Sequence, residues 1–208
     1  MNQILANQIP SAILEKGIKK TFLKNINIFN INSDVTKCYL IQSGMVKIYV
    51  DHENGRRSIL DFAGCNDWLG ELSIFYNEAD IKENKVIHEV QCLEFGIDDL
   101  RQLCKEDAAI SFYFASYISG KLLNRSYRMS EYLNYSLEQR FASFILQHQK
   151  NGIYNIPHTD VSEYLNISYR HVLYVIKHFC EQGILAKGTK GKGYVISDVD
   201  KLAQIRSK

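Results

Sequence analysis

Residues 161–175 have the spacing of a helix-turn-helix, and this segment constrains the chain more than any other. Its apolar side chains recur at helical spacing, at Val161, Leu165, Ile167, Val172 and Val175. Asn166 falls where the turn needs a left-handed backbone, which asparagine tolerates better than most residues other than glycine. Ser168 is then placed to cap a second helix. We expect this second helix to enter the major groove of DNA.

The first turns of that second helix carry the side chains that we expect to face DNA. Arg170 can form a bidentate contact with a guanine, and Ser168 can contact a phosphate while it caps the helix. A non-specific phosphate contact is the alternative for each polar side chain. The predicted set on this helix is Ser168, Tyr169, Arg170, His171, Tyr174 and Lys177, whereas Val172, Val175 and Ile176 should face the core.

A β-hairpin with a tip rich in glycine and lysine is predicted after Gly183, as the wing of a winged helix-turn-helix. Lys187, Lys190 and Lys192 lie in it. A run of charge is usually a solvated loop, but beside a recognition helix phosphate contact is the better interpretation. The charge balance agrees. Residues 151–208 carry 8 lysines and arginines against 5 acidic residues, and residues 1–150 carry 17 against 18.

The chain from about residue 17 to residue 96 is predicted to form short strands separated by turns. Strand-like runs occupy residues 19–25, 26–31, 37–42, 45–51 and 56–64. Turn residues separate them at 32–34, at Ser43-Gly44 and at 53–55, where Asn54-Gly55 is a hairpin signal. Many short strands at close spacing indicate a small barrel or β-roll.

One long amphipathic helix is predicted from residue 98 to about residue 135, where the chain has no proline and only one glycine, Gly120. A small roll cannot cover so long a stripe, so a helix from a second copy is the expected partner and packing within the chain is the alternative. Arg125 on this stripe calls for an anionic partner. The stripe comprises Ile110, Phe114, Ile118, Lys121 or Leu122, Arg125, Met129 and Tyr132.

Composition and motifs exclude several classes of protein. No apolar run is long enough to span a bilayer, and the first residues do not look like a secretory signal, so we expect a cytoplasmic protein. The five cysteines form no CxxC pair, which favours reduced thiols over a metal centre. No catalytic triad, P-loop, dinucleotide motif or paired histidine ligands occur, so we expect neither an enzyme nor a bound cofactor.

Taken together, the segments resemble the CRP/FNR family of bacterial transcription regulators over nearly the full chain. The resemblance is carried by residues 43–49 (SGMVKIY), 54–57 (NGRR), 66–72 (NDWLGEL) and 137–142 (LEQRFA). It implies an α+β chain with a jelly-roll-like β-roll sensor domain at 1–108, a long dimerisation helix at 109–135 and a winged helix-turn-helix at 136–208. A homodimer of this kind would read an inverted repeat in double-stranded DNA.

Departures from the family bear on the effector. Members that bind cyclic nucleotides place an arginine and a hydroxyl residue soon after the segment equivalent to 70–72, where the arginine pairs with the cyclic phosphate. This chain has no arginine between Arg57 and Arg101. We therefore expect that cAMP is not the effector. The resemblance places a candidate pocket for an unidentified small molecule at Gly70, Glu71, Leu72, Arg125 and Ser126.

Two further alternatives stay open. Cys65 stands in the loop before the segment 66–72 and is the candidate thiol for redox sensing. The helix-turn-helix could instead bind protein, which would make the chain a redox- or ligand-sensing adaptor. Activation of transcription would also require a surface that contacts RNA polymerase. The predicted base-reading residues are not the family's common set, because Arg170 takes the usual glutamate position and Tyr174 the usual arginine position.

Overall fold

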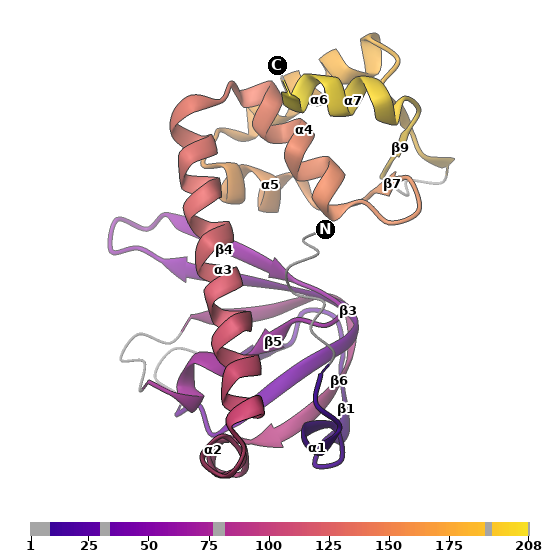
Figure 1. Ribbon diagram of the computed structural model, residues 1–208. Helices are drawn as coiled ribbons and strands as arrows, with labels where there is room; N and C mark the ends of the chain where they lie inside the picture. The colour runs from indigo at the N-terminus through magenta and orange to yellow at the C-terminus, as the bar shows by residue number, and fades with distance from the viewer. Residues whose placement is uncertain (1–8, 30–33, 77–81, 190–192, 208) are drawn as a thin grey trace. The chain divides into compact units, whose positions relative to one another are not determined.

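The computed structural model describes residues 9–29, 34–76, 82–189 and 193–207. The chain divides into two units, one that extends to Asn124 and one that begins at Arg125 (Figure 1). Among the described residues, no helix is long and apolar enough to cross a membrane.

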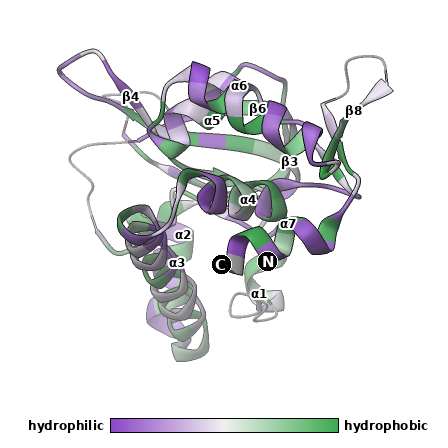
Figure 2. Ribbon diagram, turned by 90° about the horizontal axis from the view of Figure 1, so that it is seen from above, coloured by the Kyte–Doolittle hydropathy of each residue, from purple (hydrophilic) through white to green (hydrophobic). Residues whose placement is uncertain are grey.

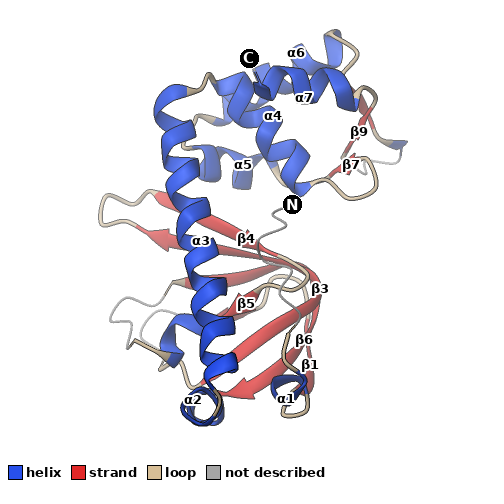
Figure 3. Cartoon of the chain, viewed as in Figure 1, coloured by secondary structure: helices blue, strands red, loops and turns tan. Residues whose placement is uncertain are grey.

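The first unit contains an antiparallel β-roll, which confirms the predicted fold. Its strands form one sheet in the order β1-β6-β3-β4, with β2 on β6 and β5 on β3. In Figure 3 most of the strands belong to this unit. The strands are β1 (Ile18–Phe22), β2 (Asn27–Phe29), β3 (Lys37–Asp51), β4 (Arg57–Ala63), β5 (Trp68–Leu69) and β6 (Glu83–Gly96).

The predicted break at Ser43-Gly44 is wrong, because β3 runs through it as one strand of 15 residues. Gly44 instead marks an irregularity, where the pairing of β3 with β6 shifts register on either side. Its φ of 99° is one that glycine adopts without strain, and a Cβ there would lie 2.2 Å from the Glu89 carbonyl oxygen. The glycine thus allows the two backbones to approach, where a turn had been expected.

The predicted single helix is two helices, α2 (Ile97–Glu106) and α3 (Ala108–Asn134). Asp107 between them has an extended backbone, and its carboxylate accepts a hydrogen bond of 2.8 Å from the Ala109 N–H. A short helix α1 (Ser11–Leu14) and a 3₁₀ helix η2 (Glu71–Ile74) complete this unit. The break arises because the aspartate satisfies a free N–H at the start of a new helix.

The first turns of α3 belong to the core of the β-roll. Ile110 and Phe114 are buried, and the Phe114 ring lies 5.1 Å from Trp68. Tyr113 and Tyr117 are buried in the same cluster. Farther along, Leu122, Met129 and Leu133 are 66, 59 and 69% exposed. The apolar stripe of α3 therefore changes along the helix from a buried face to an exposed one.

The second unit is a winged helix-turn-helix. Its core is aromatic: the Phe141 ring is stacked on Phe179, with centroids 6.1 Å apart, and meets Tyr154 edge to face at 6.1 Å. In Figure 2 the ribbons of α6 and α7 carry both hydrophilic and hydrophobic segments, as helices with one buried face do. The elements are α4 (Leu137–His148), β7 (Ile153–Tyr154), α5 (His158–Leu165), α6 (Tyr169–Glu181), β8 (Leu185–Lys187), β9 (Tyr194–Ile196) and α7 (Val199–Ser207).

Candidate nucleic-acid interface and buried cassette

The turn between α5 and α6 has the geometry that the sequence predicts. Asn166 adopts φ 51° and ψ 51°, in the left-handed region. Ser168 is the N-cap of α6, and its hydroxyl oxygen accepts a hydrogen bond of 3.3 Å from the His171 N–H. The capped end fixes where α6 begins, so the first residues of the helix have defined positions.

Two faces of α6 divide the predicted residues as expected. Val172, Val175 and Ile176 are buried in the core of this unit. The opposite face is polar and aromatic, and the Tyr174 ring stacks on His178 with centroids 6.3 Å apart. The side chains predicted to face DNA are all exposed: Ser168, Tyr169, Arg170, His171, Tyr174 and Lys177.

The predicted wing is present as the antiparallel pair β8 and β9, which β7 joins on the other side of β9. Lys187 is exposed at the end of β8. Gly193 needs to be glycine because its φ is 68° and a Cβ would lie 2.3 Å from the Tyr154 carbonyl oxygen. Lys190 and Lys192 lie outside the described residues, so their contact with DNA stays a prediction.

His158, a residue that no sequence pattern indicated, links three parts of this unit. It opens α5, and its ring lies 5.8 Å from Tyr194 of the wing and 6.2 Å from Tyr169 at the start of α6. Burial lowers the pKa of His158 below its usual value. The sequence shows only that each of the three segments has an aromatic side chain. Which of these rings contact one another depends on the tertiary fold.

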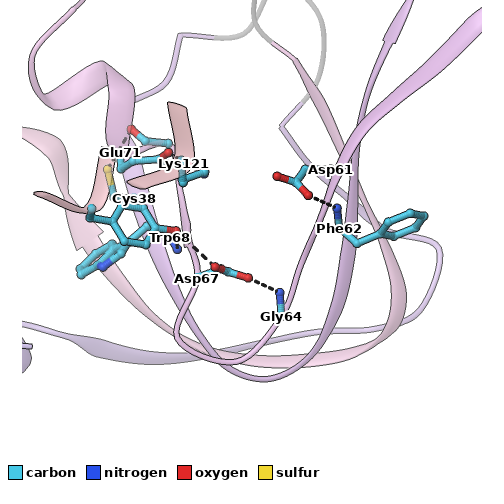
Figure 4. A network of polar contacts seen from close by, with 10 residues as sticks. Cys38, Asp61, Phe62, Gly64, Asp67, Trp68, Glu71 and Lys121 are labelled. Atoms are coloured by element: carbon cyan, nitrogen blue, oxygen red, sulfur yellow. Dashed lines mark hydrogen bonds and ion pairs between the residues drawn. The ribbon is translucent and has the colours of Figure 1, made fainter. Parts of the chain in front are cut away.

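In the first unit, residues 67–74 form a buried cassette around an ion pair. Gly70 has φ 82° and starts η2, which places Glu71 in its first turn. Lys121 of α3 lies 2.7 Å from the Glu71 carboxylate, and their side chains are only 15 and 5% exposed (Figure 4). The charge of the cassette glutamate is thus balanced by the chain itself.

A second set of polar contacts holds the start of the cassette against α3. The Trp68 N–H donates to the Tyr117 hydroxyl at 2.8 Å, and the Trp68 indole donates to the Tyr113 hydroxyl at 2.9 Å. Asp67 accepts a hydrogen bond of 2.8 Å from the Gly64 N–H, as Figure 4 shows. Burial raises the pKa of Asp67.

Arg101 of α2 holds the other end of the cassette. Its guanidinium donates to the carbonyl oxygens of Ser73 at 2.6 Å and Ile74 at 3.1 Å. Cys38 donates from its thiol to the Gly70 carbonyl oxygen at 3.1 Å, and burial raises the pKa of that thiol. The cassette is therefore bound at both ends by side chains from β3, α2 and α3.

The remaining predicted site residues belong to different units of the chain. Gly70, Glu71 and Leu72 lie in the cassette, whereas Arg125 and Ser126 begin the second unit, so the effector pocket stays a prediction. The Arg125 Nε is buried and makes no hydrogen bond to any described residue. Cys65 is an exposed free thiol. Within the described residues, no cluster of histidine, cysteine or acidic side chains could hold a metal ion.

Comparison with known proteins assigns both units. Residues 19–107 match the model of the cyclic nucleotide-binding domain, and residues 139–205 match that of the Crp-like helix-turn-helix domain. Regulatory protein YeiL of Escherichia coli O157:H7 is 29% identical over 165 residues, which cover 79% of this chain and 74% of YeiL. A CRP-like cAMP-activated global transcriptional regulator of Mycobacterium tuberculosis is 26% identical over 208 residues, with 94% and 92% covered.

Solved structures share the fold at lower identity. FixK2 from Bradyrhizobium japonicum superposes with a TM-score of 0.77 at 17% identity, over 91% of this chain and 96% of FixK2. A regulator of the crp/fnr family from Eubacterium rectale superposes with a TM-score of 0.76 at 18% identity, over 100% and 96%. The order of roll, long helix and winged helix is therefore that of known regulators.

Proposed function

Because this chain belongs to the CRP/FNR family of transcription regulators, we propose that it works as a homodimer that reads an inverted-repeat operator in double-stranded DNA. The observation that carries the proposal is the exposed face of α6. There a capped helix start presents Arg170 and Tyr174 while the opposite face is buried. A helix held in this way fits the major groove.

The second half of α3 supports the homodimer. Leu122, Met129 and Leu133 are exposed, and with Ser126 they follow the alternating spacing of four and three that builds a coiled-coil seam. A second copy of the same stripe would cover them. Two copies of α6 would then meet half-sites whose centres lie about one helical turn of DNA apart.

The roles of the DNA-facing residues follow from their chemistry. Arg170 is the residue best suited to read a base, because its guanidinium can donate two hydrogen bonds to one guanine. Lys187, Lys190 and Lys192 in the wing would contact phosphates, which adds affinity without selecting a sequence. The operator should differ from those of relatives that place a glutamate and an arginine at positions 170 and 174.

We also propose that cAMP does not control this protein. Relatives from Mycobacterium tuberculosis and Pseudomonas aeruginosa carry the description cAMP-activated. Here, however, no arginine lies between Arg57 and Arg101, and Lys121 already neutralises Glu71. A cyclic phosphate would lack its bidentate partner. Isothermal titration with cAMP should give no heat of binding at micromolar concentrations. A micromolar dissociation constant would contradict this proposal.

DNA selection tests the main proposal. Purified protein is incubated with a pool of random duplexes, bound DNA is amplified over several rounds, and the enriched sequence is used in a gel-shift titration against a scrambled duplex. We expect an inverted repeat that binds more tightly than the scrambled control at the same salt concentration. Equal affinity for both duplexes, or no binding at low salt, would contradict the proposal and leave the protein-binding adaptor as the alternative.

A further inference from the structure

The last turns of α3 are bonded to the turn of the helix-turn-helix. The hydroxyl oxygen of Tyr132 accepts a hydrogen bond of 3.2 Å from the side-chain amide of Asn166. Asn166 is the left-handed residue that separates α5 from α6. A side chain of the long helix therefore contacts the residue that sets the angle between the two helices of the motif.

Arg140 of α4 contacts both Tyr132 and the end of α5. Its guanidinium lies 4.6 Å from the centre of the Tyr132 ring, a cation–π distance. The same guanidinium donates a hydrogen bond of 3.3 Å to the carbonyl oxygen of Leu165, the last residue of α5. Tyr132 and Arg140 thus hold two successive residues, Leu165 and Asn166, where α5 ends and the turn begins.

One helical turn earlier, α3 makes another contact with α5. Arg128 donates a hydrogen bond of 2.6 Å to the Tyr164 hydroxyl and lies 5.4 Å from the centre of that ring. Residues 128 and 132 are four apart, so they share one face of α3. That face differs from the exposed stripe with Leu122 and Leu133, so the same helix can bind the helix-turn-helix and pair with a second copy.

We propose that Tyr132 and Arg140 are positioning residues for DNA recognition, which fix α6 in the orientation that sequence-specific binding needs. The inference rests on the proposed function. Only Asn166 and Ile167 lie between the end of α5 and the cap of α6, so any rotation at this turn moves the whole recognition helix. Base contacts depend on that orientation, whereas phosphate contacts tolerate a small displacement.

The test compares Tyr132→Phe with the wild type on two DNA probes. One probe is the sequence that the wild type enriches from a random pool, and the other is a scrambled duplex of equal length and composition. Tyr132→Phe keeps the ring under Arg140 and removes only the hydroxyl. We expect roughly three- to tenfold weaker binding to the enriched duplex, the range of one hydrogen bond, and unchanged binding to the scrambled duplex.

Matched variants separate positioning from folding. Tyr135→Phe removes a hydroxyl that makes no hydrogen bond to the described residues, on a side chain that is 44% exposed, and it should bind both probes as the wild type does. Asn166→Gly keeps the left-handed backbone and removes the amide, so it should show the same loss as Tyr132→Phe. The double variant should lose no more than either single one, because both remove the same bond.

The outcomes distinguish this inference from the proposed function. A wild-type protein that enriches no sequence contradicts the proposed function and the inference with it. If the wild type does enrich a sequence, the inference alone is overturned when Tyr132→Phe prefers the enriched duplex over the scrambled one as strongly as the wild type does. The inference is also overturned if Tyr132→Phe loses the same affinity for both duplexes and melts at a lower temperature. That is the result expected of a residue that only stabilises the fold.

Discussion

Glu71 and Lys121 are two buried charges that depend on each other. The removal of both from water offsets much of their mutual attraction, so such a pair adds little stability relative to two apolar side chains. The loss of one partner is different, because it leaves an isolated charge in a medium that solvates it poorly. The pair therefore fixes the contact between η2 and α3.

We expect Lys121→Met to lower the free energy of unfolding by about 3–5 kcal/mol, since it leaves Glu71 buried and unpaired. Glu71→Gln in the same chain should restore most of the loss. The control is Lys37→Met, which breaks a more exposed pair with Glu94 at 3.4 Å and should cost less than about 1 kcal/mol. Urea denaturation measures all three, and a double variant no more stable than Lys121→Met would refute the argument.

His158 makes the stability of the second unit depend on pH. Burial lowers its pKa in the folded protein, so the unfolded chain binds a proton more readily. The contribution of neutral His158 to the free energy of unfolding is therefore fully present above the unfolded pKa of 6.5, and it falls as the pH drops below that value. Burial raises the pKa of the neighbouring Tyr194, so that ring carries no charge in this range.

His158→Phe keeps a ring and removes the titration. The wild type should lose more unfolding free energy between pH 7.5 and pH 5.5 than the variant does, because only the wild type takes up this proton on unfolding. Urea denaturation at the two pH values gives both differences. The prediction fails if wild type and variant lose the same amount.

The structural roles of some residues can be predicted from the sequence, and those of others cannot. Asn166 and Ser168 are predictable because turn and cap chemistry involves neighbours in the chain. The bond from Asn166 to Tyr132 joins residues 34 apart, and the ring of His158 meets Tyr194 only after the wing has formed. Contacts of this kind depend on the packing of whole elements, which no local pattern contains.

Among the elements, α3 shows most clearly what periodicity can and cannot predict. The helical spacing of apolar residues is correct on both sides of Asp107, and no proline or glycine marks the break. Only the capping ability of aspartate hints that a new helix begins there. Gly44 is ambiguous in the same way, because a glycine in the sequence can indicate either a turn or a place where two strands approach closely.

The exposed stripe of α3 yields a prediction about assembly. Leu122→Glu combined with Leu133→Glu places two charges per chain on the proposed seam, where like charges would face each other across two copies. We expect a dimeric wild type and a monomeric variant in sedimentation equilibrium. Leu23→Glu, an exposed leucine on the roll, is the control and should stay dimeric. A monomeric wild type, or a double variant that remains dimeric, would contradict the seam.

The DNA affinity of the complete protein combines two kinds of contact, one to bases and one to phosphates. Arg170→Ala should relax the preference at one base pair in each half-site, at a cost of about 1–3 kcal/mol in discrimination. Lys187→Ala should weaken binding to enriched and scrambled duplexes alike and reduce the slope of log affinity against log salt by about one per subunit. Gel-shift titrations at several salt concentrations separate these effects. Identical behaviour of the two variants would show that the assigned roles are wrong.

The architecture was predictable from the order of its segments, because hairpin signals, a long proline-free stretch and a capped turn each have few structural interpretations. The partner of Glu71 was not predictable in this way. Lys121 lies 50 residues away, on a stripe where it was one of two candidates for an apolar position. In a sequence, a lysine is expected at the surface, and only the three-dimensional position of Glu71 explains why Lys121 can be buried.

The pairing of β3 with β6 also bears on how the chain acquires its fold. Residue 37 pairs with residue 96 and residue 49 with residue 83, so the central strands of the roll meet only after long loops have closed. The winged helix also depends on distant segments, because α4 packs on α7 and β7 pairs with β9. Because folding slows as contacting residues lie farther apart in the chain, the pairing of β3 with β6 and the packing of α4 on α7 should both form late in refolding.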